Sequence, residues 1–141
     1  MRPTGKDARA VLGHRGARLG QATLVLLVLA ACGRGRPVDS KRLAGLKAPS
    51  AHLAGEALYN ANCSGCHGLN AGGTDHGPPL VDAVYRPGHH GDAAFLLAVK
   101  LGVKAHHWRF GDMPPLPGIT DADMPYVTGY VRWLQREMGI E

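Results

Sequence analysis

The residues most able to do chemistry are the two thiols and the imidazole of Cys63-Ser64-Gly65-Cys66-His67. A disulfide or thioredoxin-like redox pair favours a βαβ context, which the surrounding sequence lacks. A zinc site needs a fourth ligand, and no second C-x-x-C or H-x-H pair is present. Covalent haem attachment uses all three residues, because two thiols bond the porphyrin vinyl groups and the next imidazole reaches the iron. The motif therefore favours one covalent haem c, held by Cys63 and Cys66, with His67 as an iron ligand.

A second axial ligand is predicted at Met113. It lies 46 residues after His67, in the sequence Phe110-Gly111-Asp112-Met113-Pro114-Pro115. The prolines fix the backbone, so such a loop can hold a ligand with little motion. Met124 and Met138 fall at the start and on the body of a predicted terminal helix and are expected to pack.

Histidines offer the main alternatives to Met113. His106 and His107 precede it by six and seven residues and are its main rivals for the iron. Imidazole also suits copper and zinc. A separate copper or zinc site is therefore conceivable from five of the histidines, which are His76, His89, His90, His106 and His107.

From Ser50 to Gly139 the chain resembles the class I c-type cytochromes with a single haem. The resemblance rests on an amphipathic helix leading into the C-x-x-C-H motif, then Gly77-Pro78-Pro79-Leu80, then Met113-Pro114, then an aromatic terminal helix. It implies His67 and Met113 as axial ligands of the iron. It also implies that the carbonyl of Pro78 accepts a hydrogen bond from the His67 ring, which would fix the orientation of that ring.

Three helices should carry these residues. They are expected over 51–62 with Ser50 as N-cap, over 92–101 with Asp92 as N-cap and Gly102 as the stop, and over 121–138 with Thr120 as N-cap. Pro125 removes one backbone donor and argues for a start near Asp123 or a loosened first turn.

The predicted fold class is all-α, a small cytochrome c fold of three to four helices around one covalently attached haem. No segment shows strand-like alternation of useful length. Phe95, Leu96 and Val99 are expected to face the haem or the core. By the resemblance, Gly55 and Gly129 allow the first and last helices to cross closely.

The N-terminal segment reads as an export signal. Residues 1–20 are basic and Gly-rich, and residues 22–31 form an apolar run too short to span a bilayer. Leu29-Ala30-Ala31-Cys32 resembles the lipobox of bacterial lipoproteins, in which the Cys is acylated; an ordinary cleavage site with a free Cys32 is the alternative. We expect a signal peptide over 1–31, an acylated Cys32 with a flexible tether over 32–50, and the cytochrome domain over 51–141.

Composition excludes several classes of protein. With 141 residues the chain supports one compact domain. Its net charge of +5 comes mostly from residues 1–31, and the remainder carries eleven basic and ten acidic residues, which argues against nucleic-acid binding. The stretch 86–109 has four basic residues and one acidic residue, so a basic face for acidic partners is a hypothesis.

These features predict an electron carrier and no enzyme. Because both axial positions of the iron are occupied, we expect outer-sphere electron transfer with redox protein donors and acceptors that dock transiently. A lipid anchor would hold the protein on the periplasmic or extracytoplasmic side of a membrane. Two alternatives stay open. One is a haem-based ligand sensor or peroxidase-like enzyme, if Met113 dissociates; the other is a copper-handling lipoprotein that uses the histidines.

Overall fold

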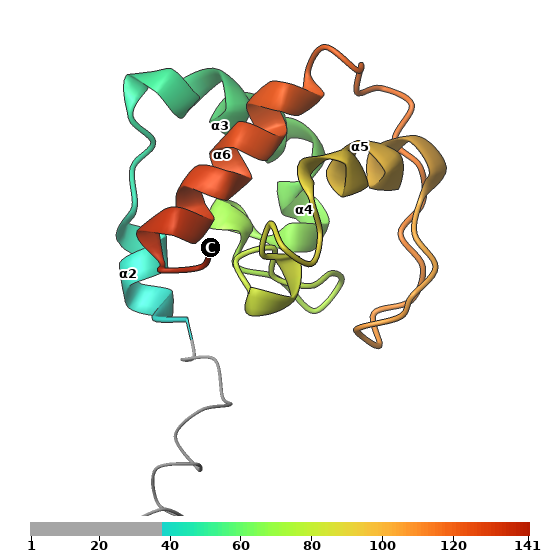
Figure 1. Cartoon of the computed structure of the whole chain (residues 1–141), viewed down its shortest axis with the longest axis horizontal. Coiled ribbons are helices and arrows are strands. Elements are labelled where there is room, and N and C mark those ends of the chain that lie inside the picture. Colours follow the sequence, from blue (N-terminus) through green and yellow to red (C-terminus); the bar gives the residue numbers. More distant parts are fainter. Residues whose placement is uncertain (1–37) are drawn as a thin grey trace, which may run out of the picture. The chain divides into compact units, whose positions relative to one another are not determined.

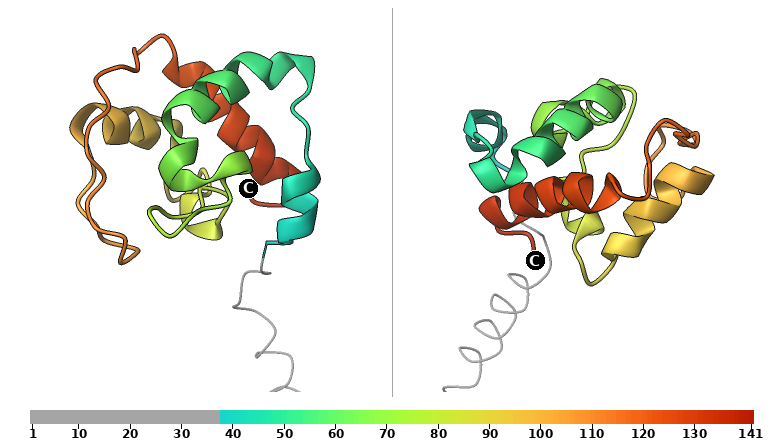
Figure 2. Two further views of the ribbon diagram at one scale, coloured as in Figure 1. Left: turned by 180° about the vertical axis from the view of Figure 1, so that it is seen from behind. Right: turned by 90° about the horizontal axis from the view of Figure 1, so that it is seen from above.

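The computed structural model describes residues 38–141. Over this range the chain is helical and forms no strand, and its three longest helices are α3 (Leu53–Asn62), α5 (Asp92–Leu101) and α6 (Met124–Glu137). Helices α3 and α6 cross each other, and α5 lies beside the N-terminal part of α6 (Figures 1 and 2). The predicted all-α class is therefore confirmed.

Shorter elements connect the long helices. Two are α-helices, α2 (Ser40–Gly45) and α4 (Ser64–His67), which raise the total above the three to four helices expected. Three 3-10 turns cover Ser50–His52, Leu69–Ala71 and Ala83–Tyr85. Within residues 38–141, no helix combines the length and the apolar character that a membrane crossing requires.

Helix α6 supplies one side of the core. As expected, Val127, Tyr130, Val131 and Leu134 are all buried. Tyr59 on α3 is also fully buried, and its ring centroid lies 5.5 Å from that of Tyr130. Tyr130, in the apolar stripe of α6, therefore packs directly on α3.

The start of α6 differs from the expectation of a helix from residue 121. Residues 121–123 form a turn, α6 begins at Met124, and Pro125 lies in its first turn, where its missing N–H is tolerated. The predicted N-cap, Thr120, does not cap α6 with its side chain. Instead, the Asp123 carboxylate accepts hydrogen bonds from the backbone N–H and the hydroxyl of Thr120, at 2.9 and 2.6 Å.

The crossing of α3 and α6 depends on one of the two expected glycines. Gly55 lies against the backbone of Tyr126, whereas nothing lies within 4 Å of a Cβ placed at Gly129. The expected role of Gly129 in the crossing is therefore wrong.

The other helix boundaries were partly predicted. Helix α5 has the bounds expected and ends at Gly102, whose φ of 74° favours glycine. Its N-cap is Gly91 rather than Asp92. Ser50 does not cap α3; it opens a 3-10 turn, and α3 begins at Leu53.

Residues 38–50 are not the flexible tether that the sequence suggests. Asp39 caps α2 by accepting hydrogen bonds from two backbone N–H groups, and Leu43 of α2 is buried. The side chain of Asn70 donates to the carbonyl of Leu43 at 2.8 Å. The folded unit thus begins before residue 51. The predicted signal peptide over 1–31 and Cys32 lie outside the described residues.

Candidate haem site

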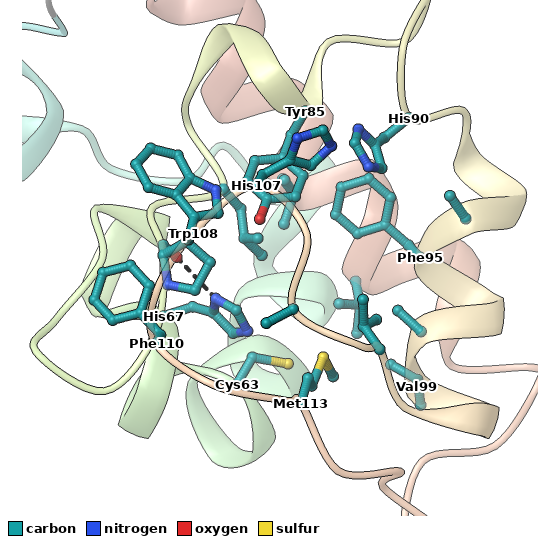
Figure 3. A pocket seen from close by; sticks show the side chains of 18 of the residues that line it. Cys63, His67, Tyr85, His90, Phe95, Val99, His107, Trp108, Phe110 and Met113 are labelled. Carbon is teal, nitrogen blue, oxygen red and sulfur yellow. Dashed lines mark hydrogen bonds between the residues drawn. The ribbon is translucent and has the colours of Figure 1, made fainter.

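A largely apolar cavity lies between α3, α4, α5, α6 and the loop over residues 103–113. Helix α5 turns Phe95, Ala98 and Val99 into it, and α6 turns Val127 and Val131 into it from another side. Figure 3 shows this cavity from close by. Leu96, which was expected at the haem or the core, does not line the cavity but packs against the core.

The C-x-x-C-H motif forms one helical turn at the cavity. Cys63 ends α3, Cys66 and His67 belong to α4, and the N–H of His67 donates to the carbonyl of Cys63 at 2.9 Å. Residues three and four positions apart share one face of a helix, which explains why this spacing serves a common site. Cys63 and His67 line the cavity, whereas Cys66 is exposed and is not among the lining residues.

Cys63 and Cys66 form no disulfide, and the Cys63 thiol is not acidified. Cys63 and Cys66 are both free. Burial, with a smaller effect from Cys66, raises the pKa of Cys63 to about 11. Thiols that work in disulfide exchange have a lowered pKa. Within residues 38–141 the thiols also belong to no group of three potential metal ligands.

The ring of His67 is held by Pro78, as expected. Its Nδ1 lies 2.8 Å from the carbonyl oxygen of Pro78, shown as the dashed line in Figure 3. Because a carbonyl only accepts, Nδ1 carries the proton and Nε2 keeps its lone pair free for a metal. Burial lowers the pKa of His67, and the hydrogen bond to Pro78 opposes that effect. The neutral imidazole is therefore favoured.

Met113 enters the same cavity from the loop that follows α5. Its backbone N–H and C=O pair with those of Val103, both at 2.9 Å. Farther out, the Asp112 carboxylate accepts a hydrogen bond from the N–H of Ala105 and forms an ion pair with Lys104. These bonds fix the backbone on both sides of Met113. Figure 3 shows its side chain extending into the cavity.

A family model for cytochrome c matches residues 53–135. The chain belongs to the cytochrome c family. Proteins of this family bind haem c covalently and usually carry electrons. The match contains every predicted site residue except Cys32. Comparisons of this cytochrome with curated proteins and with solved structures gave no match.

The cavity of this cytochrome fits a haem in two respects. Its lining is mainly apolar, as a porphyrin face requires. The Trp108 indole nitrogen is buried and has no hydrogen-bond partner among residues 38–141. The Trp108 indole is close enough to the Tyr85 hydroxyl to lower the pKa of that phenol as a donor, against the larger rise that burial causes, but it makes no hydrogen bond of good geometry to that oxygen. An indole N–H without an acceptor suits the carboxylate of a haem propionate, because an unpaired buried donor is costly.

Other potential ligands of this cytochrome also reach the cavity. Met124 lines it and is also part of the buried core, which agrees with the packing role predicted for this residue. His90, His106 and His107 line it as well. Met138 does not line the cavity, which agrees with a packing role.

Sequence reasoning missed the polar groups that shape the cavity wall. Trp108 and Tyr85 line the cavity, and the buried Arg132 of α6 holds the loop that carries Tyr85 by donating to its carbonyl at 2.6 Å. Gln135 donates to the carbonyls of Leu80 and Tyr85. Arg132 and Gln135 occupy inward positions on α6, but polar residue types are expected on the solvent face. The aromatic residues around Trp108 were the one signal in the sequence that could have indicated this part of the cavity wall.

Proposed function

We propose that this cytochrome is an electron carrier with a His67 and Met113 ligated haem. One observation carries the proposal: His67 and Met113 reach the same apolar cavity from different segments of the chain, beside Cys63. The haem, when bound, supplies a one-electron couple between ferrous and ferric iron. Cys63 and Cys66 would hold it through thioether bonds.

Contacts within the chain orient both proposed ligands. His67 presents Nε2 because Pro78 occupies Nδ1. Met113 is fixed by its two backbone hydrogen bonds to Val103. A thioether is a soft ligand that favours ferrous iron and raises the reduction potential relative to two imidazoles. Ligands on rigid supports stay in place in both oxidation states, which suits electron transfer and leaves no coordination position for a substrate.

Docking of redox partners would use the exposed rim of the cavity. Phe110 lines the cavity and is 41% exposed. The proposed basic face is weaker than the sequence suggested, because Lys100 pairs with Asp121 and Lys104 with Asp112. Arg86 and Arg109 remain without an ion pair among residues 38–141. We infer short-lived docking with modest electrostatic steering.

Export and membrane attachment are part of the proposal and rest on sequence alone. The apolar run over 22–31 and the Leu-Ala-Ala-Cys sequence that ends at Cys32 support a lipid anchor. Covalent attachment of haem c takes place outside the cytoplasm, which agrees with an export signal. We propose a periplasmic or extracytoplasmic location for the folded domain.

Optical spectra of the purified holoprotein in both oxidation states test the proposed ligation. The oxidised protein should show a weak band at the red end of the visible spectrum, which reports iron–sulfur ligation, and the reduced protein should not bind carbon monoxide. Ready binding of carbon monoxide would overturn the proposed role as an electron carrier and favour a haem-based ligand sensor or a peroxidase-like enzyme.

A further inference from the structure

Four histidines from two segments meet at one end of the cavity. His89 and His90 precede α5, and His106 and His107 precede Met113. The ring centroids of His89, His90 and His107 lie 4.6 to 5.2 Å from one another. These three, called here the histidine cluster, can each place a ring nitrogen within 4.8 Å of the others. His76 is not part of this group, so the five-histidine site considered from sequence is not formed.

We propose that the histidine cluster is a second metal centre, separate from the haem iron, that binds Zn²⁺ through His89, His90 and His107. Neutral imidazole is a common zinc ligand, and three imidazoles leave a fourth position for water. Within residues 38–141 this is the one group of three potential metal ligands that the fold brings together.

The spacing of the first ligand pair matches tetrahedral zinc. Nε2 of His89 lies 3.4 Å from Nε2 of His107. Two nitrogens at the usual Zn–N distance of about 2.0–2.1 Å are separated by about 3.3–3.4 Å in a tetrahedron. In a square-planar site the adjacent nitrogens would be closer, at about 2.8 Å, which favours zinc over Cu²⁺.

His90 is already oriented as a ligand. Its Nδ1 lies 2.8 Å from the carbonyl oxygen of Val84, so Nδ1 donates and Nε2 is free. Metal-binding histidines usually have such a partner on the second nitrogen. Arg132 donates to the backbone carbonyl of His90 and holds its main chain in place. His90 is thus in the tautomer that binds a metal through Nε2.

His106 has a different place. Its Nδ1 lies 2.7 Å from the carbonyl oxygen of Lys104, and it falls outside the group of three. Its ring nevertheless lies beside that of His107, with centroids 4.2 Å apart. It can therefore support the His107 ring by contact without being a ligand.

The cluster is joined to the haem site by two shared residues. His90 and His107 line the cavity, at the end away from Cys63 and Met113 in Figure 3, whereas His89 does not line it. A bound dication there would stabilise ferrous over ferric iron, since the ferrous form carries one positive charge less. By linkage, Zn²⁺ should bind the reduced protein more tightly. This coupling rests on the proposed function; the zinc site does not.

Calorimetric titration of the full chain with Zn²⁺ tests the site. The protein carries its haem and no histidine tag. We expect one equivalent to bind with a dissociation constant of about 1 µM or below. His89→Gln and His107→Gln should each weaken binding at least about tenfold, because loss of a ligand costs no less than loss of its hydrogen-bond partner. His76→Gln, at an exposed histidine outside the cluster, is the matched control and should bind as the parent does.

Several results would overturn the zinc site. These are no binding by the parent, equal binding by His89→Gln, or equal weakening by His76→Gln. Preference for Cu²⁺ over Zn²⁺ beyond the general affinity order of these ions would contradict tetrahedral geometry. The reduction potential, measured with and without Zn²⁺, should rise in the parent and not in His89→Gln. Zinc binding without that rise refutes the coupling alone and leaves both the zinc site and the electron carrier standing.

Discussion

A Cβ atom added to Gly55 would lie 2.1 Å from the carbonyl oxygen of Tyr126. This contact joins α3 to the first turns of α6, and the atom that would be struck belongs to the backbone, which cannot rotate away. Any side chain at position 55 must therefore push the two helices apart.

Gly55→Ala should lower the free energy of unfolding of the holoprotein by about 2–3 kcal/mol, as overpacked sites do. Gly129→Ala is the matched control, because a Cβ at Gly129 meets nothing within 4 Å. It should raise stability by about 0.5–1 kcal/mol through helix propensity. Denaturant unfolding measures both, and equal effects of the two substitutions would contradict the crossing described.

Substituting the methionines one at a time should show whether Met113 or Met124 is the axial ligand of the haem iron. Met113→Leu should abolish the red-end absorption band of the oxidised protein and lower the reduction potential, because the soft sulfur ligand is lost. Met124→Leu and Met138→Leu keep the side-chain volume and should retain the band. Loss of the band in Met124→Leu alone would move the axial ligand from the loop to α6.

Arg132 and Asp92 should differ sharply in their effect on stability. The Arg132 side chain is 7% exposed and donates to Asp92, Gln135 and two backbone carbonyls, whereas Asp92 is 73% exposed. Arg132→Met leaves buried acceptors without donors and should cost about 3 kcal/mol. Asp92→Asn should cost less than about 1 kcal/mol, because water can solvate that position. Chemical unfolding of both variants is the measurement, and comparable losses would disprove the asymmetry.

Acid should remove the contribution of the Asp123 carboxylate to the stability of the fold. Hydrogen bonds from Thr120 lower the pKa of this carboxyl from its ordinary 3.8. The stabilisation is therefore present above the ordinary pKa and is lost as pH falls through the lowered one. Asp123→Asn should unfold at a lower temperature than the parent at pH 6, and the difference should shrink as the pH falls below the ordinary pKa of the carboxyl. Asp75→Asn, at an exposed carboxylate outside the helices, is the matched control for the loss of one surface charge.

The local geometry around His67 in the candidate haem site was predictable because its signals lie in nearby residues. The C-x-x-C-H spacing specifies a single helical turn, and Gly77-Pro78 places a carbonyl against the ring of His67. Helix α5 was also predicted with its correct bounds, since a ten-residue apolar segment is closed by Gly102. These features depend on neighbouring residues and little else.

Other features depend on residues distant in sequence and were missed. Helix α2 has six residues, too few to be stable alone, and forms because Leu43 is buried and Asn70 binds its carbonyl. Asp92 looked like an N-cap, but its carboxylate binds Arg132, forty residues away. In the histidine cluster, His89 and His107 are likewise eighteen residues apart in sequence, and no local sequence pattern predicts their contact.

The anchoring of α2 by Asn70 sets how far the domain can travel from its proposed lipid. Only a seven-residue segment leads from Cys32 to Asp39, which caps α2. Even fully stretched, it spans no more than about 25 Å. The domain would therefore stay at the bilayer surface, and its donors and acceptors would have to come within that short radius.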